Sequence, residues 1–146
     1  MGARDSRSVE RQAVVLDSGA LIAFERNDKK VRTLVELAHG HGRTLHVPAG
    51  VVAQVWRDGR KQARLARLLG STVVAVRALD RTEAQAVGVV CGQKRHDDVV
   101  DASVILLARR FRATVVTSDP DDLRRLDSTL QLVPCYAGIE DELKGR

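Results

Sequence analysis

Four aspartates of this chain occupy positions where strands should end or helices should begin: Asp17, Asp98, Asp101 and Asp119. Asp17 and Asp119 follow apolar runs that are typical of strands buried in a parallel sheet. A carboxylate in such surroundings needs a hydrogen-bond donor or a cation as its partner. If several of these carboxylates meet at one edge of the sheet, they form a site for a divalent metal ion.

Most of these aspartates also have a simpler structural explanation. Aspartate is a preferred N-cap residue, and helical stretches follow Asp17, Asp98 and Asp119. Pro120 suits the first position of such a helix. Asp101 is harder to explain as a cap because the residues on both sides of it are apolar. An arginine or a cation would serve as its partner.

Further polar residues near these positions could support a metal site. Asp98 and Asp101 are three residues apart, so they share one face of a helix start, where like charges repel each other. Asp122 suits the first turn of a helix, where the helix dipole favours an acid. Thr117 could orient a neighbouring carboxylate, or it could be an ordinary strand residue. Acidic ligands without a Cys or His pattern favour Mg²⁺ or Mn²⁺ over zinc.

The composition is that of one globular domain with a basic surface. The chain has 146 residues, of which 44% are hydrophobic, and a net charge of +5. Such a charge favours phosphate-bearing partners, while only 3% aromatic residues argue against a base-stacking platform. Cys91 and Cys135 read as free thiols of a cytoplasmic protein. No membrane span or signal peptide is expected. Mg²⁺ and Mn²⁺ stabilise charge on a phosphoryl group, so a metal site on a protein with a basic surface indicates phosphodiester cleavage.

Short apolar runs alternate with helical stretches along the whole chain. The runs predict strands at 13–16, 44–47, 71–76, 113–117 and 130–133. Helices are predicted at 20–25, 31–38, 49–56, 62–69, 80–92, 98–111 and 121–126. This alternation indicates an α/β fold with a parallel sheet, in which ligands bind at the carboxyl ends of the strands. We expect a flexible extension at 1–12, one domain at 13–137 and a polar tail at 138–146.

Three motifs, in this order and spacing, resemble the PIN-domain ribonucleases, and in style the VapC toxins of bacterial toxin–antitoxin pairs. They are Val-Leu-Asp-Ser-Gly-Ala-Leu-Ile-Ala at 15–23, Asp-Val-Val-Asp-Ala-Ser at 98–103 and Val-Val-Thr-Ser-Asp-Pro-Asp-Asp-Leu at 115–123. The resemblance implies a three-layer α/β/α sandwich with a short-stranded parallel sheet. It also implies a Mg²⁺- or Mn²⁺-dependent endoribonuclease, the toxin of a type II pair, that hydrolyses RNA with a metal-activated water. A cognate antitoxin and a homodimer are the implied partners.

The resemblance also assigns roles by position. Asp17, Asp101 and Asp119 correspond to the catalytic metal ligands, and Asp98 and Asp122 to acids that support them. The family usually has a glutamate on the helix after the second strand, where this chain has Gln54. A neutral glutamine is a poorer ligand for a hard cation, so metal affinity should be weaker, but its carbonyl can still coordinate the ion or hold a metal-bound water. An alternative is therefore a PIN-like RNA-binding or protein-interaction module with weakened catalysis.

Other candidates remain. Arg60, Arg64 and Arg67 fit one helical face that could follow an RNA backbone, although a solvated face explains them equally well. His96 could move a proton, but a single loop histidine is more often just exposed. Glu25 on the first helix could compensate for Gln54. A phospho-acceptor receiver domain would also place aspartates at strand ends, but it needs an acidic pair and a late lysine that are missing here.

Overall fold

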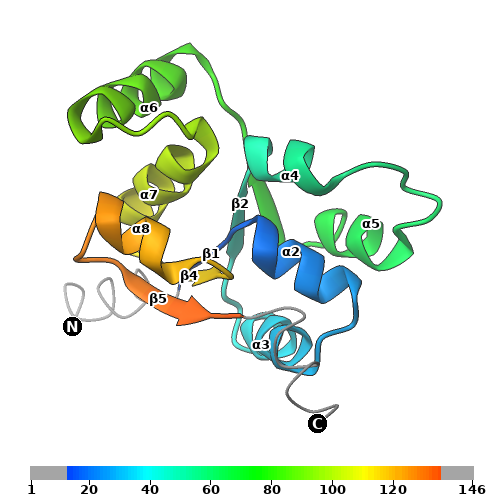
Figure 1. Ribbon diagram of the computed structural model, residues 1–146. Coiled ribbons are helices and arrows are strands. Elements are labelled where there is room, and N and C mark those ends of the chain that lie inside the picture. The colour runs from blue at the N-terminus through cyan, green and yellow to red at the C-terminus, as the bar shows by residue number, and fades with distance from the viewer. Residues whose placement is uncertain (1–12, 136–146) are drawn as a thin grey trace, which may run out of the picture.

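Five parallel strands form the centre of the protein, whose computed structural model describes residues 13–135 (Figure 1). The strands are β1 (Val14–Leu16), β2 (Leu45–Pro48), β3 (Val74–Arg77), β4 (Thr114–Thr117) and β5 (Gln131–Pro134). Their order in the sheet is β3-β2-β1-β4-β5. The chain builds outward from β1 to one edge and then crosses over to β4. The carboxyl ends of β1 and β4 are therefore the topological switch point, where ligands bind in open α/β sheets.

Seven helices of the described chain cover the sheet, in agreement with the predicted three-layer sandwich. They are α2 (Ser18–Glu25), α3 (Lys29–Gly40), α4 (Ala49–Val55), α5 (Ala63–Leu69), α6 (Arg81–Lys94), α7 (Val99–Phe111) and α8 (Pro120–Leu126). On one face α7 packs against β1, β2 and β4, and α6 packs against α7 (Figure 1). On the other face α2 packs against β1 and β4, with α3, α4 and α5 around it. No helix in the described residues is long and apolar enough to span a membrane.

Aspartate caps explain where most of the helices begin. The side chains of Asp17, Asp28, Asp80, Asp98 and Asp119 each accept a hydrogen bond from a backbone N–H in the first turn of the following helix. Such a cap stabilises a helix by about 1 kcal/mol. The first helix begins at 18 rather than the predicted 20, because the cap at 17 starts it immediately. The third strand begins at 74 rather than 71. The segments at 1–12 and 138–146 lie outside the described residues.

Apolar strands form the centre of the core, and buried residues of the helices cover them on both faces. Every residue of β1 is buried, and so are Leu45 and Val47 of β2 and Val115 and Val116 of β4. The two cysteines are free, as predicted. Burial on both faces explains why these strands read as continuous apolar runs.

His46 of β2 is a polar side chain that lies inside this core. It is 3% exposed, and its Nδ1 accepts a hydrogen bond of 3.0 Å from Nε of Arg77. Its ring stacks on Phe111 with a centroid separation of 4.0 Å. Burial, and then the positive charges of Arg77 and Arg110, lower the pKa of His46 from 6.5 to about 4. The fold therefore holds this histidine neutral.

We expect His46 to make the protein less stable in acid. The unfolded chain gains a proton near pH 6.5, whereas the folded chain resists protonation down to about pH 4. Stability should therefore fall as the pH drops from 6.5 to 4. Between pH 7.5 and 4.5, wild type should lose about 2–3 kcal/mol more than His46→Gln, which does not titrate. Urea denaturation at both pH values measures the difference, and equal losses in the two proteins would refute it.

Candidate metal site at the carboxyl edge of the sheet

Asp17 and Asp119 lie at the switch point, and Thr117 connects them. Asp17 follows β1, donates its N–H to the carbonyl of Val116 at 3.2 Å, and accepts a hydrogen bond from the N–H of Ala20 at 3.1 Å. The buried Thr117 is the last residue of β4. Its hydroxyl oxygen accepts from the N–H of Asp119 at 2.9 Å, and the hydroxyl also hydrogen-bonds to the Asp17 carboxylate. These contacts place Thr117 where it could orient Asp17, and the orienting role itself remains a prediction.

Gly19 allows the two chain segments to approach each other. A Cβ at this position would lie 2.0 Å from Oγ of Ser118, 2.4 Å from its Cβ and 3.0 Å from its backbone nitrogen. Any side chain at 19 would therefore push the first turn of α2 away from the turn between β4 and α8. Glycine at position 19 thus lets the two segments that carry Asp17 and Asp119 lie close together.

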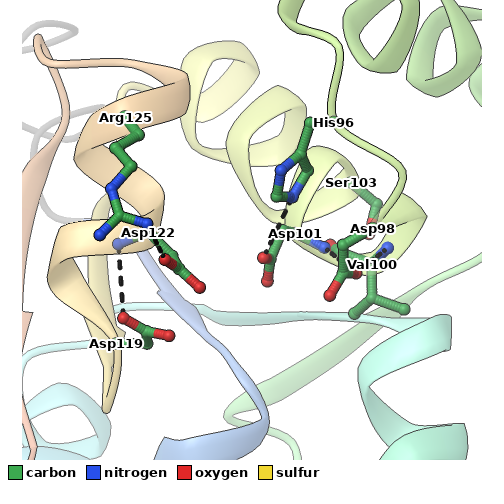
Figure 2. Close-up of polar contacts among 8 residues, drawn as sticks. All are labelled: His96, Asp98, Val100, Asp101, Ser103, Asp119, Asp122 and Arg125. Atoms are coloured by element: carbon green, nitrogen blue, oxygen red, sulfur yellow. Dashed lines mark hydrogen bonds and ion pairs between the residues drawn. The ribbon is translucent and has the colours of Figure 1, made fainter.

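A second acidic group lies at the start of α7. Oδ1 of Asp98 accepts hydrogen bonds from the N–H groups of Val100 and Asp101, both at 3.0 Å. His96 lies before this cap, and its Nε2 is 3.4 Å from Oδ2 of Asp101 (Figure 2). One potential ligand atom each of His96, Asp98 and Asp101 lies within 4.8 Å of the other two. Ligand atoms at this spacing could hold a metal ion. The set includes His96, which sequence reasoning set aside as an exposed loop residue.

Asp122 of α8 lies between the two groups. Its N–H donates to Oδ1 of Asp119 at 3.3 Å, and its carboxylate accepts from Nη1 of Arg125 at 2.8 Å. Figure 2 shows the carboxylates of Asp122 and Asp101 facing each other across the space between α8 and α7. The charge of Asp122 also raises the pKa of Asp101. The acids therefore form a row of two groups from β1 to α7, with Asp122 between them.

Three carboxylates of this row, those of Asp17, Asp101 and Asp119, have raised pKa values. Burial, opposed by the hydrogen bond from Thr117, raises the pKa of Asp17, and the charge of Asp119 adds to the effect. Burial and the neighbouring Asp98 raise the pKa of Asp101 to about 6. Burial and Asp122 likewise raise the pKa of Asp119. Oxygen donors that repel one another, beside a buried imidazole nitrogen without a hydrogen bond, fit a divalent cation.

The predicted ligands are thus divided between two groups. Asp17 pairs with Asp119, whereas Asp101 joins Asp98 and His96. Among residues 13–135, only His96, Asp98 and Asp101 form a set of three acidic, histidine or cysteine residues at metal-ligand spacing. The metal roles of the three predicted ligands remain predictions.

Gln54 belongs to α4, a helix that contacts α7. It is exposed on α4, whose first turn contacts the first turn of α7: a Cβ on Gly50 would be 3.2 Å from Cγ2 of Val100. Glu25 cannot compensate as suggested, because it ends α2, at the far end of this helix from Asp17. There it accepts a hydrogen bond from Gln62 at 3.1 Å.

The three arginines of the predicted RNA-binding face are all exposed, but they do not lie on one helix. Arg64 and Arg67 belong to α5, whereas Arg60 lies in the turn before it. Its Nε is 3.6 Å from Oδ1 of Asp58. Residues 56–62, around Asp58 and Gly59, are not helical. The prediction that the three arginines share one helical face was therefore wrong.

Comparison with known proteins identifies the family. A search of curated protein sequences found no match. Among solved structures, the fold is similar to a chain of VapBC2 from Rickettsia felis, in a crystal structure with a DNA fragment from their promoter. The TM-score is 0.62 and the sequence identity 16%, over 84% of this chain and 98% of that chain. The family model of the PIN domain matches residues 14–128, and the chain therefore belongs to the PIN domain family.

Proposed function

We propose that this protein is a Mg²⁺- or Mn²⁺-dependent endoribonuclease and the toxin of a type II toxin–antitoxin pair. The observation that carries the proposal is the row of carboxylates with raised pKa values at the switch point of a PIN domain. Perturbed acids gathered in one place are typical of catalytic sites. The likeness in fold to VapBC2 supports the toxin–antitoxin context. In that context the partners are an antitoxin and a second copy of the chain, and the compartment is the cytoplasm.

The residues of the site have three kinds of task in this proposal: holding the cation, orienting its ligands and binding RNA. Asp17, Asp101 and Asp119 hold the cation, which supplies positive charge to activate water and to stabilise the phosphoryl group. Thr117 orients Asp17 through its hydroxyl. Asp122 is held by Arg125 and faces Asp101, so it keeps negative charge at the centre of the row. Arg64 and Arg67, with Arg60, offer cations for an RNA backbone.

Asp17→Asn is the substitution that tests the proposal with least disturbance to the fold. Asparagine caps a helix as well as aspartate does, so α2 should keep its first turn. The charge on the cation's ligand is lost, and we expect metal-dependent RNA cleavage to fall by at least about 100-fold. The measurement is cleavage of total RNA with Mg²⁺ or Mn²⁺, with and without EDTA. Cleavage that survives both EDTA and the substitution would refute the metal assignment.

A module without catalysis is the second candidate. The neutral Gln54, at the position where the family usually has a glutamate, favours it, because one acid fewer weakens the binding of a cation. Calorimetric titration with Mn²⁺ distinguishes the two functions. Binding in the millimolar range or tighter supports the nuclease, whereas no binding in that range supports the module.

A further inference from the structure

The turn between α6 and α7 fixes the position of His96. The C-cap of α6 is Arg95, whose positive φ of 50° ends the helix and redirects the chain. The N–H of His96 then donates to the carbonyl of Cys91 at 3.0 Å. The imidazole points toward the first turn of α7, and the side chain is only 26% exposed (Figure 2). The backbone thus holds the ring against the acidic site.

The nitrogen Nε2 of His96 lies near Asp101 but lacks a hydrogen bond of good geometry. The atom is buried, and in the described part of the chain it makes no hydrogen bond. Oδ2 of Asp101, at 3.4 Å, is close enough for an ion pair, but the contact lacks hydrogen-bond geometry. A buried polar atom requires a hydrogen bond or another partner to replace its lost contact with water. A cation between the nitrogen and the carboxylates would meet this requirement.

The spacing around His96 suits such a cation. Ligands about 2.1 Å from an octahedral ion lie roughly 3.0 Å apart when adjacent and about 4.2 Å apart when opposite. The ligand atoms of His96, Asp98 and Asp101 all lie within 4.8 Å of one another, so only small movements would be needed. Asp98 uses one oxygen for both of its helix-capping bonds, which leaves the other for the ion.

From this geometry we infer that His96 binds the cation through Nε2, together with Asp98 and Asp101, and makes the site select Mn²⁺ over Mg²⁺. The inference rests on the proposed function, because it assigns a nitrogen ligand to the same cation. Imidazole nitrogen is a good ligand for transition-metal ions, whereas Mg²⁺ prefers oxygen. Two acids of the row, Asp98 and Asp101, and one imidazole nitrogen then hold the cation at the start of α7.

Pulsed electron paramagnetic resonance of bound Mn²⁺ tests the inference directly. In protein without a polyhistidine tag, the wild-type spectrum should show modulation from a directly bound ¹⁴N. His96→Gln should remove this modulation and weaken Mn²⁺ binding at least 10-fold in calorimetry, while Mg²⁺ binding changes less than about 3-fold. His39→Gln, at an exposed position near the end of α3, is the matched control and should change neither property. His96→Asp should restore Mn²⁺ binding without the nitrogen signal.

The outcomes separate this inference from the proposed function. Wild-type protein that binds Mn²⁺ and cleaves RNA without a ¹⁴N signal would overturn the inference and leave the nuclease intact. A signal that persists in His96→Gln would do the same. Failure of the wild-type chain to bind Mn²⁺ in the millimolar range would overturn both.

Discussion

Asp101→Asn should lower metal-dependent RNA cleavage by at least about 100-fold and, at the same time, make the metal-free protein more stable. The first effect follows from the loss of a charged ligand in the proposed site. The second follows from the pKa of Asp101, which burial and the charge of Asp98 raise to about 6. At pH 7.5 the folded protein therefore contains an ionised Asp101 carboxylate in surroundings that favour its protonated form. Removing that charge should stabilise the metal-free fold by about 1 kcal/mol, after allowance for the 30% exposure of the side chain.

A saturating cation should reverse the order of stability. Wild type gains free energy from binding, whereas Asp101→Asn gains much less, so wild type should become the more stable protein in Mn²⁺. Urea denaturation at pH 7.5, with EDTA and with Mn²⁺, measures the unfolding free energy of both proteins in each condition. Asp80→Asn is the control, because Asp80 also lies at the start of a helix, but at the exposed start of α6. If Asp101→Asn destabilises the metal-free protein, Asp101 serves the fold rather than a cation.

Much of the fold follows from short-range signals in the sequence. Apolar runs such as Val14–Leu16 lie in strands, and caps such as Asp28 and Asp80 mark helix starts close to where they were expected. These signals are local, because burial on both faces and the pairing of a cap with a nearby N–H depend on neighbouring residues. The strand order depends on long-range packing and came only with the structure.

The candidate site was less accessible to sequence reasoning. Capping and metal binding were weighed as alternatives for Asp98, yet one of its oxygens caps α7 while the residue also lies at metal-ligand spacing. His96 looked like an exposed loop residue because the left-handed turn at Arg95, which directs its ring inward, has no sequence signal. The space that Gly19 leaves for Ser118 joins residues almost 100 positions apart, and no local pattern reports such a contact.

That contact leads to the second large effect, which we expect from Gly19→Ala. The new methyl group would lie 2.0 Å from Oγ and 2.4 Å from Cβ of Ser118. Because Cβ is attached to the backbone, rotation of the serine side chain cannot remove the overlap. The turn between β4 and α8 must move away from α2, at a cost of about 2–3 kcal/mol in unfolding free energy. Asp119 would move with this turn, so metal-dependent cleavage should fall about 100-fold even at temperatures where the protein stays folded.

Two further variants separate this displacement from a general effect of replacing glycine. Gly88→Ala places the same methyl group on α6, where no atom lies within 4 Å, and should raise stability by up to about 1 kcal/mol because alanine favours a helix. Ser118→Gly removes both of the closest atoms, so the double variant Gly19→Ala, Ser118→Gly should recover much of the stability and cleavage. Only the serine nitrogen, 3.0 Å from the methyl group, would still resist the approach. If the double variant is as impaired as Gly19→Ala alone, the spacing between α2 and this turn does not control the site.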